Sequence, residues 1–465
     1  MSLSLKSLLV ANRGEIAVRI IRAARELGIR TVAVFSEADR ESLHVRLADE
    51  AVQIGPHQAA KSYLNADAII TAAFSAGAQA IHPGYGFLSE NASFADAVRA
   101  AGMVFVGPSG DAIRRMGDKA SARQAAVRAG VPVVPGSDGL VSDLEAARHE
   151  AARIGYPVMI KATAGGGGRG IRVCADEAAL TQQWPMAQAE AMAAFGNGAA
   201  YLERFIGRAR HIEVQILGDG QNAIHLFERE CSLQRRRQKV WEEAPSPSID
   251  DATRHALCES AVNLAKAVKY SGAGTLEYLY DDSSREFFFI EMNTRIQVEH
   301  PITEAITGVD LVREMLSIAA GNPLRLQQSD IVCRGAAIEV RLNAEDPAKG
   351  FAPQLGRIEE LVWPGGPGIR VDSMLYPGYT VSPYYDSLLA KLIVSAETRD
   401  AALARLARAL GELKLGGLKA TTASLHAALV RDERVRKADY HTGFLEPWLL
   451  ENAAGLSPAK PEVST

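Results

Sequence analysis

Five polar side chains alternate with mainly apolar ones in the segment IEMNTRIQVE, which runs from Ile290 to Glu299. The polar members are Glu291, Asn293, Arg295, Gln297 and Glu299. Successive side chains of a β-strand point to opposite faces, so an extended segment would place all five on one face. At about 3.3 Å per residue, the row from Glu291 to Glu299 would be roughly 26 Å long. A solvated strand face is the alternative, but this mixture of acid, amide and guanidinium favours a site for a metal ion and an anion.

The residues just before this stretch predict a β-hairpin. GTLEYLY and REFFFIEM are typical strands, and the turn between them lies around Asp281 to Ser284. This turn would bring Glu277 opposite or nearly opposite Glu291. Two carboxylates at cross-strand distance repel each other unless a cation lies between them. We therefore predict a Mg²⁺ site, with Mn²⁺ as the alternative metal, held by Glu277, Glu291 and the amide oxygen of Asn293.

A run of four glycines, Gly165, Gly166, Gly167 and Gly168, follows a strand that ends near Lys161. Glycine tolerates the backbone angles that let successive N–H groups wrap around anionic oxygens. Lys161 and Lys119, which opens the preceding helix, would add point charges for phosphate groups. A glycine run alone fits a flexible surface loop equally well. Together with the two lysines, it predicts a phosphate-binding lid.

The run QRRRQK from Gln234 to Lys239 is strongly basic, with Arg235, Arg236 and Arg237 in succession. Basic runs of this kind often contact RNA. Acidic residues flank this one on both sides, at positions 228, 230, 242 and 243, and they argue against a continuous nucleic-acid surface. A local anion site is the better interpretation.

Alternating strand and helix patterns predict the elements that position these residues. The fold class that we expect combines α/β and α+β parts: an N-terminal parallel α/β unit, a glycine-rich mobile lid, a strand-rich unit and a C-terminal mixed β unit. The first strand-to-helix turn is NRGE, so the dinucleotide-binding fingerprint G-x-G-x-x-G is missing where it would have to lie. The predicted boundaries are 1–117, 118–205, 206–330 and 331–447, followed by a tail at 448–465 that we expect to be disordered at its end.

Composition narrows the class of protein. The chain has 465 residues, of which 47% are hydrophobic and 23% charged, with a net charge of -4. This balance gives no bulk attraction to nucleic acid or to an anionic membrane. The four cysteines are scattered singly, without zinc-ligand spacing, and no stretch approaches the roughly 20 apolar residues of a membrane-spanning helix. We expect a soluble, cytoplasmic enzyme that binds neither nucleic acid nor membrane.

These segments together resemble the biotin carboxylase family of the ATP-grasp superfamily. The resemblance extends to LLVANRGEIA, to HPGYGFLSEN, to MGDK ending at Lys119, and to NAEDP starting at Asn343. It covers Lys6 to about Pro447, and motifs of this kind in one order are specific to the family. It implies the ATP-grasp fold with an N-terminal parallel α/β domain, a mobile lid and a C-terminal mixed β domain.

The resemblance also implies a role for each matching residue. Lys119, Lys161, the glycines 165–168, Glu203, His211 and Gln234 would bind ATP, while Glu277, Glu291 and Asn293 would hold the metal. Lys239, Arg295, Gln297 and Val298 would bind bicarbonate. Glu299 would be the general base, and Arg341 would stabilise charge on the ureido oxygen of biotin. Arg237 stands where many members have histidine and Ala164 where many have glycine, so an imidazole role at position 237 does not carry over.

The implied reaction is ATP-dependent carboxylation of biotin with bicarbonate, through carboxyphosphate, giving ADP and phosphate. The chain contains no Met-Lys-Met biotinylation site. We therefore expect biotin to be attached to a separate biotin carboxyl carrier protein, and a carboxyltransferase component to complete the complex. The resemblance further implies a homodimer, with acetyl-CoA as the default final acceptor.

Three other classes of protein are alternatives to a biotin carboxylase. Another ATP-grasp ligase would keep Glu277, Glu291 and the lid, but would not require Arg295, Glu299 and Arg341 together. A catalytically silent ATP-binding protein would have lost a metal or base residue, and none of those residues is missing here. A nicotinamide-dependent dehydrogenase is disfavoured by the NRGE turn.

Overall fold

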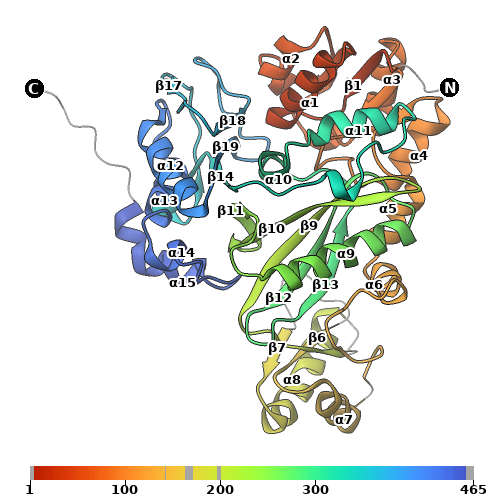
Figure 1. Cartoon of the computed structure of the whole chain (residues 1–465), viewed down its shortest axis with the longest axis vertical. Coiled ribbons are helices and arrows are strands. Elements are labelled where there is room, and N and C mark those ends of the chain that lie inside the picture. Colours follow the sequence, from red (N-terminus) through yellow and green to blue (C-terminus); the bar gives the residue numbers. More distant parts are fainter. Residues whose placement is uncertain (1–4, 142, 163–170, 196–199, 457–465) are drawn as a thin grey trace, which may run out of the picture.

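The computed structural model describes residues 5–141, 143–162, 171–195 and 200–456 (Figure 1). The four glycines 165–168 and Ala164 lie outside the described residues, and so does most of the tail. Among the described helices, none is both long enough and apolar enough to cross a membrane.

The N-terminal unit is a parallel sheet between helices, as the sequence predicts. Its strands are β1 (Ser7–Val10), β2 (Arg30–Ser36), β3 (Glu50–Gly55), β4 (Ala80–His82) and β5 (Val104–Phe105), in the order β3-β2-β1-β4-β5. Its helices are α1 (Gly14–Glu26), α2 (Leu43–Leu47), α3 (Ala66–Ser75), α4 (Ala92–Ala100) and α5 (Gly110–Gly117). The two faces of β1 belong to different hydrophobic cores. Leu8 and Val10 pack with α1, and Leu9 packs with α3 and α4. Burial on both faces is typical of parallel sheets.

The predicted lid is a small unit with its own core. It consists of the strands β6 (Val158–Ala162), β7 (Ile171–Cys174) and β8 (Ala200–Arg204), paired antiparallel in the order β7-β6-β8, and of the helices α7 (Leu144–Ile154) and α8 (Glu177–Phe195). Trp184 of α8 and Ile160 of β6 lie in this core and are almost completely buried. The unit lies at one end of the molecule, at the bottom of Figure 1, beyond α6 (Lys119–Arg128).

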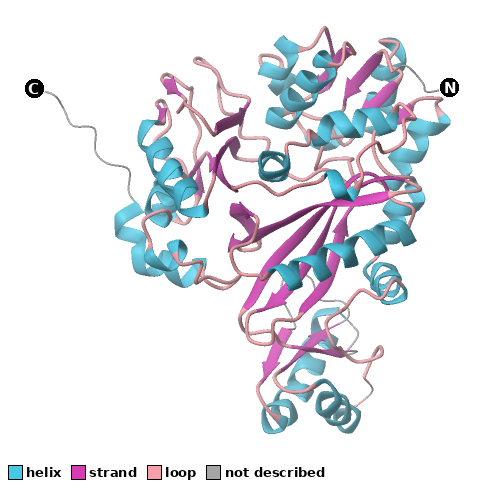
Figure 2. Ribbon diagram, viewed as in Figure 1, coloured by secondary structure: helices cyan, strands magenta, loops and turns pink. Residues whose placement is uncertain are grey.

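One large antiparallel sheet forms the centre of the described structure (Figure 2). Its eight strands, in spatial order, are β13 (Phe287–Asn293), β12 (Ser271–Asp281), β9 (Ala209–Asp219), β10 (Ala223–Arg235), β11 (Gln238–Ala244), β14 (Ala336–Asn343), β19 (Leu388–Ala396) and β18 (Ile369–Ser373). The helices α9 (Asp251–Ala267), α10 (His300–Thr307) and α11 (Leu311–Ala319) pack against it. Strands from both sides of the predicted boundary at residue 330 belong to this one sheet. The domain boundaries that the sequence predicts stay a prediction.

The C-terminal part packs helices on the far end of this sheet. These helices are α12 (Arg399–Glu412), α13 (Ala423–Leu429), α14 (Glu433–Arg436) and α15 (Leu445–Asn452). Short strand pairs lie beside them, β15 (Glu345–Asp346) with β16 (Ala352–Pro353) and β17 (Leu361–Val362) with β20 (Lys414–Leu415). Leu403, Leu406 and Leu410 lie on one face of α12 and are buried against β14 and β19.

The predicted extension of the alternating strand to Glu299 is wrong. Strand β13 ends at Asn293, the chain then forms a loop, and α10 begins at His300 with Glu299 as its N-cap residue. Two features outside the strand pattern decide this. Pro301 in the first turn favours a helix start, and Glu90 accepts hydrogen bonds from the backbone N–H of Thr294 (3.0 Å) and from the Arg295 side chain (2.9 Å).

Candidate active site

Three carboxylates form a transverse row across the central sheet. Glu277 on β12 is paired in register with Glu213 on β9 on one side and with Glu291 on β13 on the other. The predicted hairpin is therefore confirmed, with Glu277 directly opposite Glu291. Because paired strands hold opposite residues about 5 Å apart, this row concentrates negative charge and needs cations beside it.

Lys239 supplies the first of these cations. Its Nζ atom lies 2.7 Å from Glu213, 3.1 Å from Glu277 and 2.8 Å from Glu299. Burial opposes protonation of this lysine, but the three carboxylates outweigh burial and raise its pKa well above the usual value. Lys239 is thus a fixed positive charge at the centre of the site, and β11 brings it there from the basic run that the sequence singled out.

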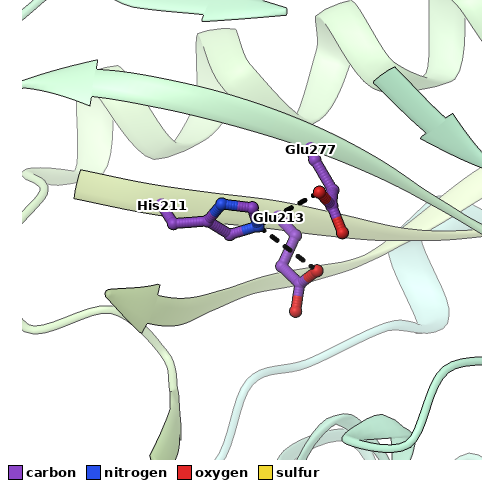
Figure 3. A group of neighbouring side chains, drawn as sticks. All are labelled: His211, Glu213 and Glu277. Carbon is purple, nitrogen blue, oxygen red and sulfur yellow. Dashed lines mark ion pairs between the residues drawn. The ribbon is translucent and has the colours of Figure 1, made fainter. Parts of the chain in front are cut away.

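His211 is the second cation beside the row (Figure 3). Its Nε2 atom lies 3.3 Å from Glu277 and 3.9 Å from Glu213. Burial disfavours the imidazolium, but Glu277 and Glu213 outweigh burial and raise the pKa of His211 to about 9. These three residues are close enough to ligate a metal ion. Without a metal ion, the three residues form an ion-pair cluster.

The predicted metal residues fit a divalent cation. Asn293 donates to Glu277 over 2.8 Å, and burial together with the charge of Glu277 raises the pKa of Glu291. No hydrogen bond or salt bridge joins the Glu291 side chain to another residue in the described part of the chain, so its carboxylate oxygens are available. Carboxylates on facing strands match the ligands that Mg²⁺ takes in nucleotide sites. The Asn293 amide oxygen, the third predicted ligand, accepts a hydrogen bond from Arg295 over 3.0 Å in the absence of a metal ion.

The loop between β13 and α10 carries the predicted bicarbonate residues. Gln297 is buried, donates to Glu277 over 3.0 Å and accepts from Arg229 over 2.6 Å. The Arg295 guanidinium donates to Asn293 over 3.0 Å, beside Glu277. The loop thus places Arg295, Gln297 and Glu299 close to the carboxylate row, although not as one strand face.

Arg341 on β14 joins this loop from the other end of the site. It donates to Glu299 over 3.0 Å, and its Nε atom donates to Glu242 over 2.7 Å. Burial would lower the pKa of Arg341, but Glu242 and Glu299 outweigh burial and raise it. Glu299, only 2% exposed, therefore lies between two cations, Lys239 and Arg341. An anion small enough to bind there would contact a lysine, an arginine and a carboxylate at once.

The predicted ATP residues lie around the lid and the adjacent strands. Lys161 on β6 forms a close ion pair with Glu203 on β8, and exposed Lys119 is the first residue of α6. Gln234 is paired with Lys239 across the β10–β11 hairpin and donates to the carbonyl of Cys231 over 2.7 Å. The predicted phosphate loop at Gly165–Gly168 lies outside the described residues.

Three buried residues of the site were missed from the sequence. They are Glu213 beside Lys239, Glu242 beside Arg341, and Arg229, which is fully buried. Arg229 donates to Glu213, Gln215, Thr275, Gln297 and Thr303 at 2.6–3.3 Å. The alternation of His211, Glu213 and Gln215 in HIEVQ offered a signal for Glu213, because it places all three on one strand face. No local pattern pointed to Arg229, whose partners come from four segments of the chain.

Comparison with known protein families matches three models along the chain. Residues 4–113 match "Biotin carboxylase, N-terminal domain", residues 118–327 match "Carbamoyl-phosphate synthase L chain, ATP binding domain", and residues 339–447 match "Biotin carboxylase C-terminal domain".

Curated relatives are similar over almost the whole chain. Biotin carboxylase 1 of Bacillus subtilis is 53% identical over 445 residues, which cover 96% of this chain and 99% of the relative. Biotin carboxylase of Pseudomonas aeruginosa is 55% identical over 444 residues, covering 95% and 98%. A pyruvate carboxylase subunit of Methanothermobacter thermautotrophicus is 50% identical over 442 residues, covering 95% and 89%.

Two solved structures of high similarity contain bound ligands. The biotin carboxylase domain of a thermophilic 2-oxoglutarate carboxylase bound to bicarbonate has a TM-score of 0.91 and 47% identity, covering 98% of this chain and 100% of that one. The corresponding domain dimer of Hydrogenobacter thermophilus, in complex with MgADP, ADP and bicarbonate, has a TM-score of 0.85 and 49% identity, covering 98% and 99%.

Proposed function

The chain belongs to the biotin carboxylase family of ATP-dependent ligases, and from this premise we propose that it carboxylates biotin on a separate carrier protein in the first half-reaction of an acetyl-CoA carboxylase. The observation that carries the proposal is the position of Glu299 between Lys239 and Arg341, beside the carboxylate row of Glu213, Glu277 and Glu291. This arrangement supports the roles of Glu299 as base and of Lys239 as anion-binding cation beside a site for Mg²⁺ and phosphate.

Bicarbonate is a poor nucleophile, so the proposed residues bind it next to ATP and remove its proton. Lys239 and Arg295 hold the anion, since a lysine point charge and an arginine fork both suit a planar carboxylate-like group. Glu299 removes its proton as an oxygen of bicarbonate attacks the γ-phosphorus of ATP and the bond to ADP breaks. The products of this step are ADP and carboxyphosphate, with the proton on Glu299.

The second step transfers the carboxyl group. Carboxyphosphate divides into CO₂ and phosphate, the phosphate takes the proton from the ureido nitrogen of biotin, and that nitrogen attacks CO₂. Arg341 stabilises the negative charge that develops on the ureido oxygen. Carboxyphosphate hydrolyses readily in water, so a lid that closes over ATP would protect it.

Nucleotide and metal are held by different groups. Lys119, Lys161, Glu203, His211, Gln234 and the glycines 165–168 would bind ATP. Glu277, Glu291 and Asn293 would hold Mg²⁺, which neutralises phosphate charge when bound.

The relatives support the proposed partners. The curated relatives named biotin carboxylase support a biotin carboxyl carrier protein and a carboxyltransferase as the proposed partners. The Hydrogenobacter thermophilus domain is described as a dimer, and we propose a homodimer here. Acetyl-CoA as acceptor, a place in fatty acid biosynthesis and a cytoplasmic location complete the proposal. Relatives from pyruvate and 2-oxoglutarate carboxylases make those two acids the competing acceptors.

The deciding measurement is ADP release by the purified chain with MgATP, with bicarbonate and free biotin added separately and together. We expect ADP release to require bicarbonate and to rise when biotin is added. If free biotin has no effect, a biotinylated carrier domain replaces it. If the rate of ADP release depends on neither bicarbonate nor the carrier, the proposal is rejected in favour of another ATP-grasp ligase. Labelled bicarbonate with acetyl-CoA, pyruvate or 2-oxoglutarate in the reconstituted complex then identifies the acceptor.

A further inference from the structure

The loop between Asn293 and His300 pairs with no strand of the described residues, yet two of its carbonyls accept hydrogen bonds from buried side chains. The carbonyl of Gln297 accepts a hydrogen bond from Nδ1 of His300 over 2.7 Å, and the carbonyl of Val298 accepts one from Nζ of Lys391 over 2.9 Å. Both donors are 0% exposed. Backbone carbonyls away from water require such partners, and here the partners also fix the direction of two successive peptide units.

The directions of these two carbonyls also determine where the N–H groups of the same two peptide units point. In a trans peptide, the C=O and the following N–H are coplanar and point in opposite directions. His300 therefore aims the N–H of Val298 away from itself, and Lys391 does the same for the N–H of Glu299. Neither N–H has a hydrogen-bond acceptor in the described part of the chain. Adjacent free N–H groups at the start of α10 suit an anion.

Lys391 is a charged residue that is completely buried, which costs desolvation free energy. A lysine is rarely buried unless paired, and this one has Glu15 of α1 at 3.4 Å and Asp372 of β18 at 3.9 Å. On β19 it lies directly opposite Arg341 of β14. It thus joins the N-terminal unit, the end of the central sheet and the loop that carries Glu299. A hydrophobic residue would fill the same space without a charge to compensate, but it could not hold the Val298 carbonyl.

We propose that Lys391 and His300 are positioning residues for bicarbonate: by holding the carbonyls of Val298 and Gln297, they orient the N–H groups of Glu299 and Val298 and the base itself toward the anion. Helix α10 packs against β14 and β19 (Figure 1), and this packing fixes the position of its first residues beside the site. The inference rests on the proposed function, because it assigns these residues to its bicarbonate step.

Four variants test the inference through the Michaelis constants for the two substrates. Lys391→Met and His300→Leu remove the donors; Lys391→Arg keeps a cation, and His300→Asn keeps an N–H donor close to the position of Nδ1. We expect the two donor-free variants to raise the KM for bicarbonate by about 10-fold or more, since displacement of a positioned group by about 1 Å can cost 100-fold. The KM for ATP should change less than about 2-fold, because the nucleotide does not use this loop. His300→Asn should recover most of the loss.

The matched control is Arg399→Met. Arg399 is also a largely buried cation, but it pairs with Glu243 at 2.5 Å and with carbonyls of the C-terminal part. Its loss should lower the melting temperature without changing either KM. If Lys391→Met does not fold, because Glu15 and Asp372 lose their cation, the His300→Leu and His300→Asn pair decides the question.

The outcomes separate the two proposals. An unchanged KM for bicarbonate in folded Lys391→Met and His300→Leu, or an equal rise in both KM values, overturns the positioning role. ADP release by the unmodified chain that does not depend on bicarbonate would instead overturn the proposed function itself.

Discussion

At the scale of single residues, Glu299 is distinguished by what surrounds it. Lys239 and Arg341 donate to its two oxygens at 2.8 and 3.0 Å, and the residue stands at the N-cap position of α10. Bicarbonate bound between these cations would meet the carboxylate at hydrogen-bond distance, which is the geometry a general base needs.

The first prediction concerns this carboxylate. Glu299→Gln keeps the shape and the cap position but cannot accept a proton, so bicarbonate-dependent ADP release should fall by about 10² to 10⁴-fold. Nucleotide affinity, measured by calorimetric titration, should stay within about 2-fold of the unmodified chain. Glu314→Gln, the same chemical change on α11 outside the site, serves as the control. Near-normal turnover in Glu299→Gln would show that the base lies elsewhere.

At the scale of elements, the β12–β13 hairpin holds two carboxylates that face each other in very different surroundings. Glu277 is bound to Lys239, His211, Asn293 and Gln297. Glu291, across the hairpin, has no such partner in the part of the chain that the structure describes. One residue therefore helps to hold the sheet together, while the other is free to bind a ligand.

This asymmetry leads to the second prediction. Glu291→Gln should raise the Mg²⁺ concentration for half-maximal ADP release by about 10-fold or more, because a ligand charge is lost. In the absence of Mg²⁺ and nucleotide, the free energy of unfolding should change by less than about 1 kcal/mol, since the substitution breaks no side-chain hydrogen bond or salt bridge among the described residues. Glu277→Gln is the comparison: it should impair both properties. An unchanged Mg²⁺ requirement in Glu291→Gln would remove that residue from the metal site.

At the scale of the whole molecule, buried polar contacts join segments that are far apart in the sequence. Asp39 accepts two hydrogen bonds from Arg13, at 2.7 and 2.8 Å, and one from Tyr63 at 2.7 Å. The Arg13 guanidinium lies 4.2 Å from the ring centre of Tyr385, in the C-terminal part. Arg13 is thereby fixed between the N-terminal sheet and a segment more than 300 residues away.

The third prediction follows from the burial of this ion pair. Asp39→Asn leaves Arg13 buried and unpaired, so it should lower the free energy of unfolding by about 3–5 kcal/mol at pH 7. Burial acts to raise the pKa of Asp39, but Arg13 outweighs burial and lowers it. A lowered folded-state pKa gives stability that is complete above the unfolded-state value of about 4 and is lost as the pH falls further.

Urea unfolding at a series of pH values checks this prediction. The difference between the unmodified chain and Asp39→Asn should be constant from pH 7 to about 4 and should shrink below that. Asp111→Asn, which breaks an exposed pair with Arg114, is the control and should cost less than about 1 kcal/mol throughout. A difference that grew toward low pH would mean that Asp39 is not the anion of the pair.

Several features could be predicted from sequence because they depend on neighbours along the chain. The position of Glu277 opposite Glu291 followed from two strand patterns and a short turn, and the register confirms it. The parallel N-terminal unit followed from alternating strands and helices, and the helix starting at Lys119 from its local pattern. The family also followed from the sequence, because long motifs in one order specify it, and the comparisons confirm it.

The tertiary structure decided what local patterns could not. Alternation alone predicted a strand through Glu299, but Glu90 and Pro301 end that strand at Asn293. Arg229 and Lys391 had no local signal, since their roles exist only where separate segments meet. A strand pattern fixes which face a side chain takes, because its period is two; it carries no information about which distant charge will lie against that face. The sequence by itself therefore determined the family, the hairpin and the residue types of the site, while long-range contacts decided how the loop carrying Glu299 is held.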